Sequence, residues 1–188
     1  MIGVLLAGGR GRRLDGRSKA ALEVAGRPLA AYPAAALAAV CDRVAFVAKR
    51  SSDLPALPGV ERWYEPDEPR HPVAGIVHAL EAAGEGVLVI ASDMPYVTAE
   101  ACATLAAADG GGAPAVAGVA GGVLQPLFAL YAPAALEPLR SAGAEGRLTD
   151  MVEALGPGRV AMPAALVRSV NTAADLEAAR SAWGSGPH

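Results

Sequence analysis

The chain has 188 residues, of which 53% are hydrophobic and 19% charged, and its formal net charge is −3 at pH 7. This length suits one domain, which buries about 70% of the surface that its unfolded chain exposes. The composition is too apolar for a disordered chain. A slightly acidic chain has no overall positive field to attract nucleic acid or an anionic membrane. We therefore expect a single domain over residues 1–188, with neither of these partners.

Cysteines and apolar segments indicate the compartment. Cys41 and Cys102 form no CxxC pair and have no spacing typical of a secreted disulfide scaffold. No basic residue precedes the N-terminal apolar run, and this run is too short for a secretion signal. The charge-free stretch Gly110–Leu136 contains glycines and prolines that would interrupt a membrane-spanning helix. We expect a loop and a buried strand there, and a cytoplasmic location.

Apolar runs and turn residues predict alternating strands and helices. In chain order we expect a strand over Ile2–Ala7, a helix within Pro28–Val40, strands over Val44–Ala48 and Val60–Tyr64, a helix over Pro72–Ala83, a strand over Val87–Ala91, a helix over Ala99–Ala108, a strand over Val123–Tyr131, helices over Pro133–Arg140 and Leu148–Leu155, a strand within Val160–Val170, and a helix over Thr172–Trp183. Pro126 has no N–H for a strand ladder, which predicts an edge or bulged strand. The alternation predicts an α/β fold: a single-domain, Rossmann-like three-layer sandwich with a mostly parallel mixed sheet.

A glycine-rich, basic segment follows the first predicted strand. Gly8 and Gly9 let backbone N–H groups approach an anion closely, because glycine has no Cβ. The segment Arg10–Lys19 holds 5 of the chain's 16 cationic residues, and Lys19 is one of only two lysines. This concentration of positive charge predicts a polyphosphate site. The alternative is a solvated surface loop.

The spelling of this segment excludes two common phosphate-binding loops. A P-loop requires Gly-Lys followed by Ser or Thr, and the chain has no Gly-Lys dipeptide. The dinucleotide motif G-x-G-x-x-G, started at Gly9, would need glycine at the position of Leu14. Hydride transfer with a bound dinucleotide therefore loses its main support.

A carboxylate follows the most apolar predicted strand. Asp93 comes two residues after Val87–Ala91, and ligands of open α/β sheets bind at the carboxyl ends of the strands. Proteins typically hold Mg²⁺ with one or two carboxylates and the phosphate oxygens of a substrate. Asp93 is therefore a candidate Mg²⁺ ligand. The alternative is a turn residue before Pro95.

Seven segments, in order along the chain, carry a resemblance to a known family. They are Leu6–Gly9, Arg13–Lys19, His71–Gly75, Ser92–Pro95, Gln125–Tyr131, Gly146–Leu148 and Ser169–Leu176. Their spellings LAGG, RLDGRSK, HPVAG, SDMP, QPLFALY, GRL and SVNTAADL resemble the motifs of the nucleotidyltransferase family that includes the molybdenum cofactor guanylyltransferases. The resemblance extends over nearly the whole chain.

The resemblance implies a reaction and a role for each matched residue. A phosphate of the acceptor, molybdopterin or its molybdenum form, would attack the α-phosphorus of GTP, and pyrophosphate would leave. Lys19 would contact the triphosphate, and Asp93 would bind Mg²⁺. These two are the implied catalytic residues. The implied nucleotide-binding residues are Leu6, Ala7, Gly8, Gly9, Arg13, Lys19, Glu65 and Asp93, and the implied acceptor-binding residues are His71, Gly75 and Asn171. The resemblance also implies transient contact with proteins that mature molybdoenzymes.

Among the departures from the family's spelling, four bear on the choice of nucleotide and acceptor. Val47 stands where guanylyltransferases carry a nucleotide-binding asparagine, and Glu65 stands where they carry an aspartate. His71 replaces a glycine, and Ser169 replaces the first asparagine of the last motif. Two alternatives therefore stay open: a relative that uses CTP or another phosphorylated acceptor, and a nucleotide-binding protein without catalytic activity.

Overall fold

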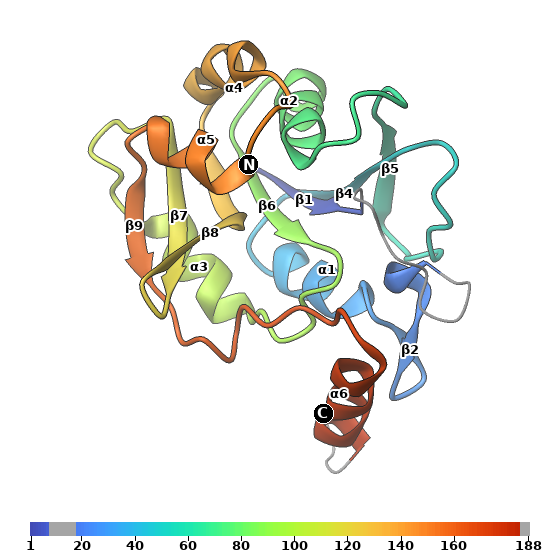
Figure 1. Ribbon diagram of the computed structural model, residues 1–188. Helices are drawn as coiled ribbons and strands as arrows, with labels where there is room; N and C mark the ends of the chain where they lie inside the picture. The colour runs from blue at the N-terminus through green and yellow to red at the C-terminus, as the bar shows by residue number, and fades with distance from the viewer. Residues whose placement is uncertain (8–17, 185–188) are drawn as a thin grey trace.

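A computed structural model describes residues 1–7 and 18–184 of the chain, and within them strands and helices alternate (Figure 1). The strands are β1 (Ile2–Leu6), β2 (Glu23–Val24), β3 (Arg27–Pro28), β4 (Arg43–Ala48), β5 (Val60–Tyr64), β6 (Val87–Ala91), β7 (Ala115–Ala120), β8 (Val123–Tyr131) and β9 (Gly158–Ala161). The α-helices are α1 (Ala31–Ala38), α2 (Pro72–Ala83), α3 (Ala99–Ala107), α4 (Leu136–Ala142), α5 (Leu148–Ala154) and α6 (Ala173–Gly184), and the short 3₁₀ helices are η1 (Lys19–Ala21) and η2 (Pro133–Ala135).

Seven of these strands form one mixed sheet in the order β5-β4-β1-β6-β8-β7-β9, whereas β2 and β3 form a separate hairpin. β1 pairs in parallel with β4 and β6, and β4 pairs in parallel with β5. β8 is antiparallel to both β6 and β7, and β9 is parallel to β7. Within the described ranges, six sheet strands therefore run one way and β8 runs the other. This confirms the predicted mixed, mostly parallel sheet.

Two apolar cores lie on opposite faces of the sheet. α1 and α3 cover one face, where Leu5 and Ile90 are buried, and α2, α4 and α5 cover the other, where Val4 and Val89 are buried. Successive residues of a strand point to opposite faces. Because β1 and β6 are buried on both faces, they appear in the sequence as unbroken apolar runs. The predicted three-layer sandwich is confirmed.

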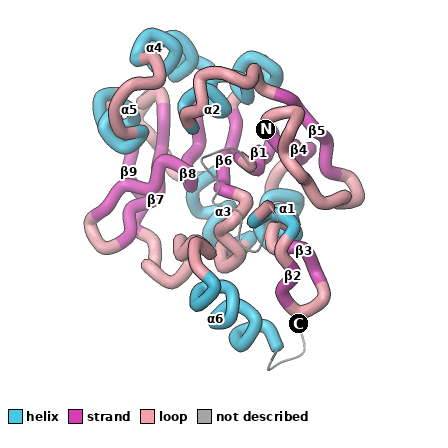
Figure 2. Tube along the Cα trace, turned by 45° about the vertical axis from the view of Figure 1, so that its right-hand side comes forward, coloured by secondary structure: helices cyan, strands magenta, loops and turns pink. Residues whose placement is uncertain are grey.

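A third and smaller core lies between α6 and the β2–β3 hairpin, beside the main layers (Figure 2). We call it the small core. Its buried members are Leu22, Val24, Leu29, Val170, Leu176 and Ala179. They come from the two ends of the chain, so the small core joins a segment that follows η1 to the segment that carries α6.

The strand that contains Pro126 is bulged, but it is not an edge strand. β8 lies between β6 and β7. Where β7 advances by one residue, from Ala117 to Gly118, the paired position on β8 moves from Ala129 to Gln125, so residues 126–128 have no partner on β7. The bulge thus accommodates the missing N–H of proline inside the sheet. The prediction of a bulge is confirmed, and that of an edge is wrong.

The charge-free stretch Gly110–Leu136 holds two strands, β7 and β8, where the sequence predicted one. Gly121 and Gly122 connect them with φ of +56° and +78°, a left-handed backbone that suits glycine. The two-residue strands β2 and β3 were not predicted, because they are too short to show an alternating pattern. No helix in the described ranges is long and apolar enough to cross a membrane.

Candidate active site

Main-chain hydrogen bonds align the ends of three neighbouring parallel strands. The Ala7 N–H, just after β1, donates to Val47 O near the end of β4 over 3.0 Å. The Ser92 N–H, just after β6, donates to Leu6 O over 3.1 Å. The chain after β1 and the chain after β6, which continues to Asp93, therefore leave the sheet at the same edge. This is the edge at which α/β sheets bind their ligands.

Three residues from separate motifs meet beside this edge. The Lys19 Nζ donates to Asn171 Oδ1 over 2.6 Å and lies 3.5 Å from Asp93 Oδ2. The Lys19 and Asp93 side chains are 17% and 21% exposed, so both are largely buried but reachable from solvent. The Val170 N–H donates to Asp93 O over 2.8 Å, which ties the segment that carries Asn171 to the end of β6. Lys19 and Asn171 are 152 positions apart, and only the fold brings them together.

The surroundings of Asp93 suit a divalent cation. Burial raises the pKa of the Asp93 carboxyl above its ordinary value, whereas the charge of Lys19 and hydrogen bonds from Lys19 and Ser169 lower it. Burial outweighs these opposing effects, and a cation bound at this carboxylate would favour its ionised form. In the described part of the chain no three His, Cys, Asp or Glu residues gather into a metal cage. A lone carboxylate fits Mg²⁺, which takes its other ligands from phosphate and water.

A second lysine–carboxylate pair lies at the ends of β4 and β5. The Glu65 Oε2 is 3.5 Å from Lys49 Nζ, and the two side chains are 3% and 15% exposed. Lys49 also donates to Pro66 O and, over 3.2 Å, to Pro69 O. Burial raises the pKa of the Glu65 carboxyl, and Lys49 opposes this shift. The Lys49 ammonium thus donates to two main-chain carbonyls of the loop after β5 and forms an ion pair with Glu65, so it holds this loop in place.

His71 begins α2 and connects two motifs. Its Nδ1 accepts from the Val73 N–H over 3.2 Å, which caps the first turn of the helix. Its Nε2 lies 3.2 Å from Gly146 O, just before α5. Because Nδ1 accepts, Nε2 carries the proton and donates to this carbonyl. His71 therefore positions Gly146–Leu148 beside the start of α2.

Gly75 lies where α2 passes closest to β1. A Cβ at this position would lie 2.3 Å from Leu6 Cδ1 and 3.4 Å from Glu65 Oε2. Contact at 2.3 Å is impossible unless Leu6 moves. The absence of a side chain therefore lets α2 approach two of the implied nucleotide-binding residues, Leu6 and Glu65.

The structure gathers most, but not all, of the residues that the sequence singled out. Lys19, Asp93 and Asn171 form one group, and Leu6, Glu65 and Gly75 form another. The implied nucleotide-binding residues Gly8, Gly9 and Arg13 lie outside the described residues. Two contributors were not among the predicted site residues. Ser169 lowers the pKa of the Asp93 carboxyl, and Lys49 pairs with Glu65; the place of Lys49 after a strand end had suggested either contact with the nucleotide or a solvated side chain.

The fold and this site define the class of protein: the chain is a nucleotidyltransferase. A family model described as the MobA-like NTP transferase domain matches residues 3–160. The chain belongs to this family.

Sequence relatives and solved structures are consistent with this assignment. A molybdenum cofactor guanylyltransferase of Cereibacter sphaeroides is 35% identical over 170 residues, which cover 87% of this chain and 86% of the relative. A second one, from Acidiphilium cryptum, is 32% identical over 95% of this chain and 93% of its own. Among solved structures, molybdopterin-guanine dinucleotide biosynthesis protein A from Archaeoglobus fulgidus has a TM-score of 0.76 at 24% identity, covering 99% of this chain and 100% of its own. The 2-C-methyl-D-erythritol 4-phosphate cytidylyltransferase of Thermus thermophilus reaches 0.70 at 21% identity, covering 97% and 98%. These structures share the fold.

Proposed function

We propose that the enzyme transfers GMP from GTP to the terminal phosphate of molybdopterin or its molybdenum form, with release of pyrophosphate. The names of the relatives that match most of the chain support this substrate pair. The observation that carries the proposal is the meeting of Lys19 with Asp93 and Asn171. Transfer between phosphates is catalysed mainly by positioning and by stabilising negative charge. The proposal includes a cytoplasmic location and transient contacts with proteins that mature molybdoenzymes.

We expect the nucleotide to bind at the carboxyl ends of the parallel strands. The residues that would line it are Leu6, Ala7, Gly8, Gly9, Arg13 and Glu65, with Lys19 on the triphosphate. Mg²⁺ on Asp93 would neutralise part of the triphosphate's charge and orient it for in-line attack. Lys19 Nζ is a compact donor that is already directed towards this carboxylate. A phosphate oxygen bound by this ammonium would therefore lie beside Asp93 and Asn171.

Binding of the acceptor is assigned to His71, Gly75 and Asn171. An ammonium only donates hydrogen bonds, so the amide oxygen of Asn171 must face Lys19. The Asn171 Nδ2 then points elsewhere, with two N–H donors for an acceptor phosphate. The amide of Asn171 would thus connect Lys19, which contacts the nucleotide, with the incoming acceptor phosphate. Such alignment of two reactants accounts for a large share of catalysis.

Pyrophosphate release tests the proposal directly. The purified protein is incubated with GTP or CTP, each with and without molybdopterin and Mg²⁺. We expect release only with GTP, molybdopterin and Mg²⁺ together, and its loss in Lys19→Met. Pyrophosphate release with CTP but not with GTP would assign the enzyme to cytidylyl transfer. Tight GTP binding without release would assign it to the non-catalytic alternative.

A further inference from the structure

The inference concerns how Lys19 and Asn171 are held together. Both residues lead directly into the small core. Three residues after Lys19, Leu22 is buried in it, and Val170 and Leu176 on either side of Asn171 are also buried there. The small core is separate from the two cores that stabilise the sheet. The relative position of Lys19 and Asn171 therefore depends on how α6 packs on the small core.

The start of α6 fixes the main chain at Asn171. The Thr172 hydroxyl accepts from the Asp175 N–H over 3.1 Å, and the Asp175 carboxylate accepts from the N–H groups of Asn171 and Thr172 over 3.0 and 2.8 Å. This reciprocal arrangement is a capping box. Any rotation or shift of α6 is therefore passed to Asn171 through hydrogen bonds.

One face of α6 docks on the rest of the molecule. Leu176, Ala179 and Trp183 follow one another at intervals of three and four residues, so they lie on the same side of the helix. Leu176 and Ala179 are buried in the small core, and Trp183 packs against it. On another side, Arg180 Nε donates to Glu23 O of β2 over 3.2 Å. α6 thus contacts the rest of the molecule along its whole length.

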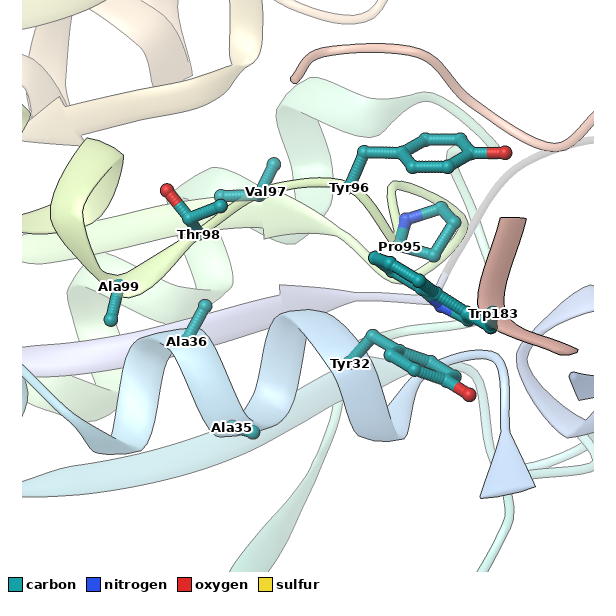
Figure 3. A pocket seen from close by; sticks show the side chains of 9 residues that line it. All are labelled: Tyr32, Ala35, Ala36, Pro95, Tyr96, Val97, Thr98, Ala99 and Trp183. Carbon is teal, nitrogen blue, oxygen red and sulfur yellow. The ribbon is translucent and has the colours of Figure 1, made fainter. Parts of the chain in front are cut away.

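Trp183 contacts two tyrosines from different parts of the fold (Figure 3). Its ring is stacked on Tyr32 of α1, with centroids 5.2 Å apart and planes at 18°, and is tilted against Tyr96 with centroids 5.8 Å apart. Arg27 lies over the Tyr32 ring, and Arg168 lies over the Tyr96 ring. Tyr96 follows Asp93 by three residues. Trp183 therefore joins α6 both to α1 and to the segment that carries the metal-site carboxylate.

We propose that Trp183 is a positioning residue, which seats α6 so that Asn171 aligns Lys19 with Asp93 for transfer. This inference rests on the proposed function. The helix is 12 residues long, so Trp183 acts over about 15–18 Å. It does not touch substrate. Misplacement of a catalytic group by about 1 Å can lower a rate by about 100-fold, so loss of one of several docking contacts is expected to cost about tenfold.

Steady-state kinetics test this role. We expect Trp183→Ala to lower kcat/KM for GTP about tenfold, and Trp183→Phe, which keeps a stacking ring, to recover most of it. Trp63→Phe, at the chain's other tryptophan on the edge strand β5, is the matched control and is expected to keep the wild-type value. A Trp183→Ala enzyme with the wild-type kcat/KM overturns the proposal, as does an equal loss in Trp183→Phe.

Fluorescence gives a readout that a purely structural role would not move. In the Trp63→Phe protein, Trp183 is the one remaining tryptophan. We expect its emission to change as GTP and Mg²⁺ are titrated, and this change to disappear when Lys19→Met is added. Because Trp183 stays in place, this measurement decides the matter even if Trp183→Ala fails to fold. Saturable GTP binding with constant emission overturns the inference.

The outcomes separate this inference from the proposed function. If the wild-type protein uses CTP and ignores GTP, the proposed nucleotide is wrong, and the same variants measured with CTP still test Trp183. If the wild-type protein transfers GMP and the Trp183 variants match it, the function stands and the positioning role fails.

Discussion

Two lysine–carboxylate pairs of this protein have the same 3.5 Å separation and different surroundings. Lys49 forms an ion pair with Glu65, which is 3% exposed, and donates to two main-chain carbonyls. Among the described residues, the hydrogen bond and ion pair of Lys19 are with side chains, those of Asn171 and of Asp93, which is 21% exposed. Main-chain carbonyls are fixed by the fold, whereas side chains can turn towards a ligand. The comparison teaches that the same ion pair braces a loop in one place and, in the other, lies between side chains that are free to turn towards a ligand.

The largest expected effect comes from removing the charge of Lys19. Lys19→Met keeps the apolar stem and should lower the rate of pyrophosphate release at least about 100-fold, since a positioned donor for developing charge contributes on this scale. Lys49→Met, measured at a temperature where it is folded, should stay within about tenfold of wild type. Equal losses in the two variants would mean that both lysines act on substrate.

The next effect concerns Asp93. Asp93→Asn keeps the shape of the side chain and removes the charge that would hold Mg²⁺, so transfer should fall about 100-fold or more. Its Tm should equal or exceed that of the wild type, because burial disfavours the ionised carboxylate. Activity assays and thermal unfolding check both halves. An active Asp93→Asn enzyme would remove Asp93 from the metal site.

A moderate effect on stability should distinguish Lys49. Lys49→Met leaves the buried Glu65 carboxylate without its ion-pair partner and two carbonyls without their donor, which should lower the free energy of unfolding by about 3 kcal/mol. Lys19→Met should change it by less than about 1 kcal/mol, since its partners reach solvent. Urea unfolding of both variants measures the difference. Similar losses would contradict the distinction between the two pairs.

The smallest effect is a pH dependence. The folded-state pKa of Asp93 is raised above its ordinary value of 3.8 by burial. Ionisation therefore costs the folded state free energy, and stability is lost as the pH rises from about 3.8 through the folded pKa. We expect the stability of Asp93→Asn relative to wild type to grow over this range and then level off. Unfolding of both proteins at pH 3.5, 5 and 7 tests this direction. A stability difference that falls as the pH rises would contradict the raised pKa of Asp93.

Apolar runs and the turn residues that bound them predicted several strands and helices correctly. The runs Val60–Tyr64, Pro72–Ala83 and Val87–Ala91 match β5, α2 and β6 at both ends. The bulge was predicted from proline alone. The place of β8 inside the sheet was not, because nothing local reveals which strand lies next to it.

For the site, motifs supplied the residues and the fold supplied their contacts. Lys19, Asp93 and Asn171 were singled out one by one, from a basic loop, a strand end and a family motif. Their mutual distances depend on the small core and α6, which no local pattern predicts. Lys49 was missed as a partner of Glu65, because an ion pair between two neighbouring strand ends requires the sheet order.

The hydrogen bond between Lys19 and Asn171 has a consequence for biosynthesis. Its partners are 152 positions apart, so a nascent chain that has emerged only as far as β9 already holds every strand of the sheet but has no amide for Lys19. Under the proposed function, competence for transfer therefore appears during translation only after all the strands of the described sheet have emerged. We expect a chain that ends before Asn171 to lack transfer activity.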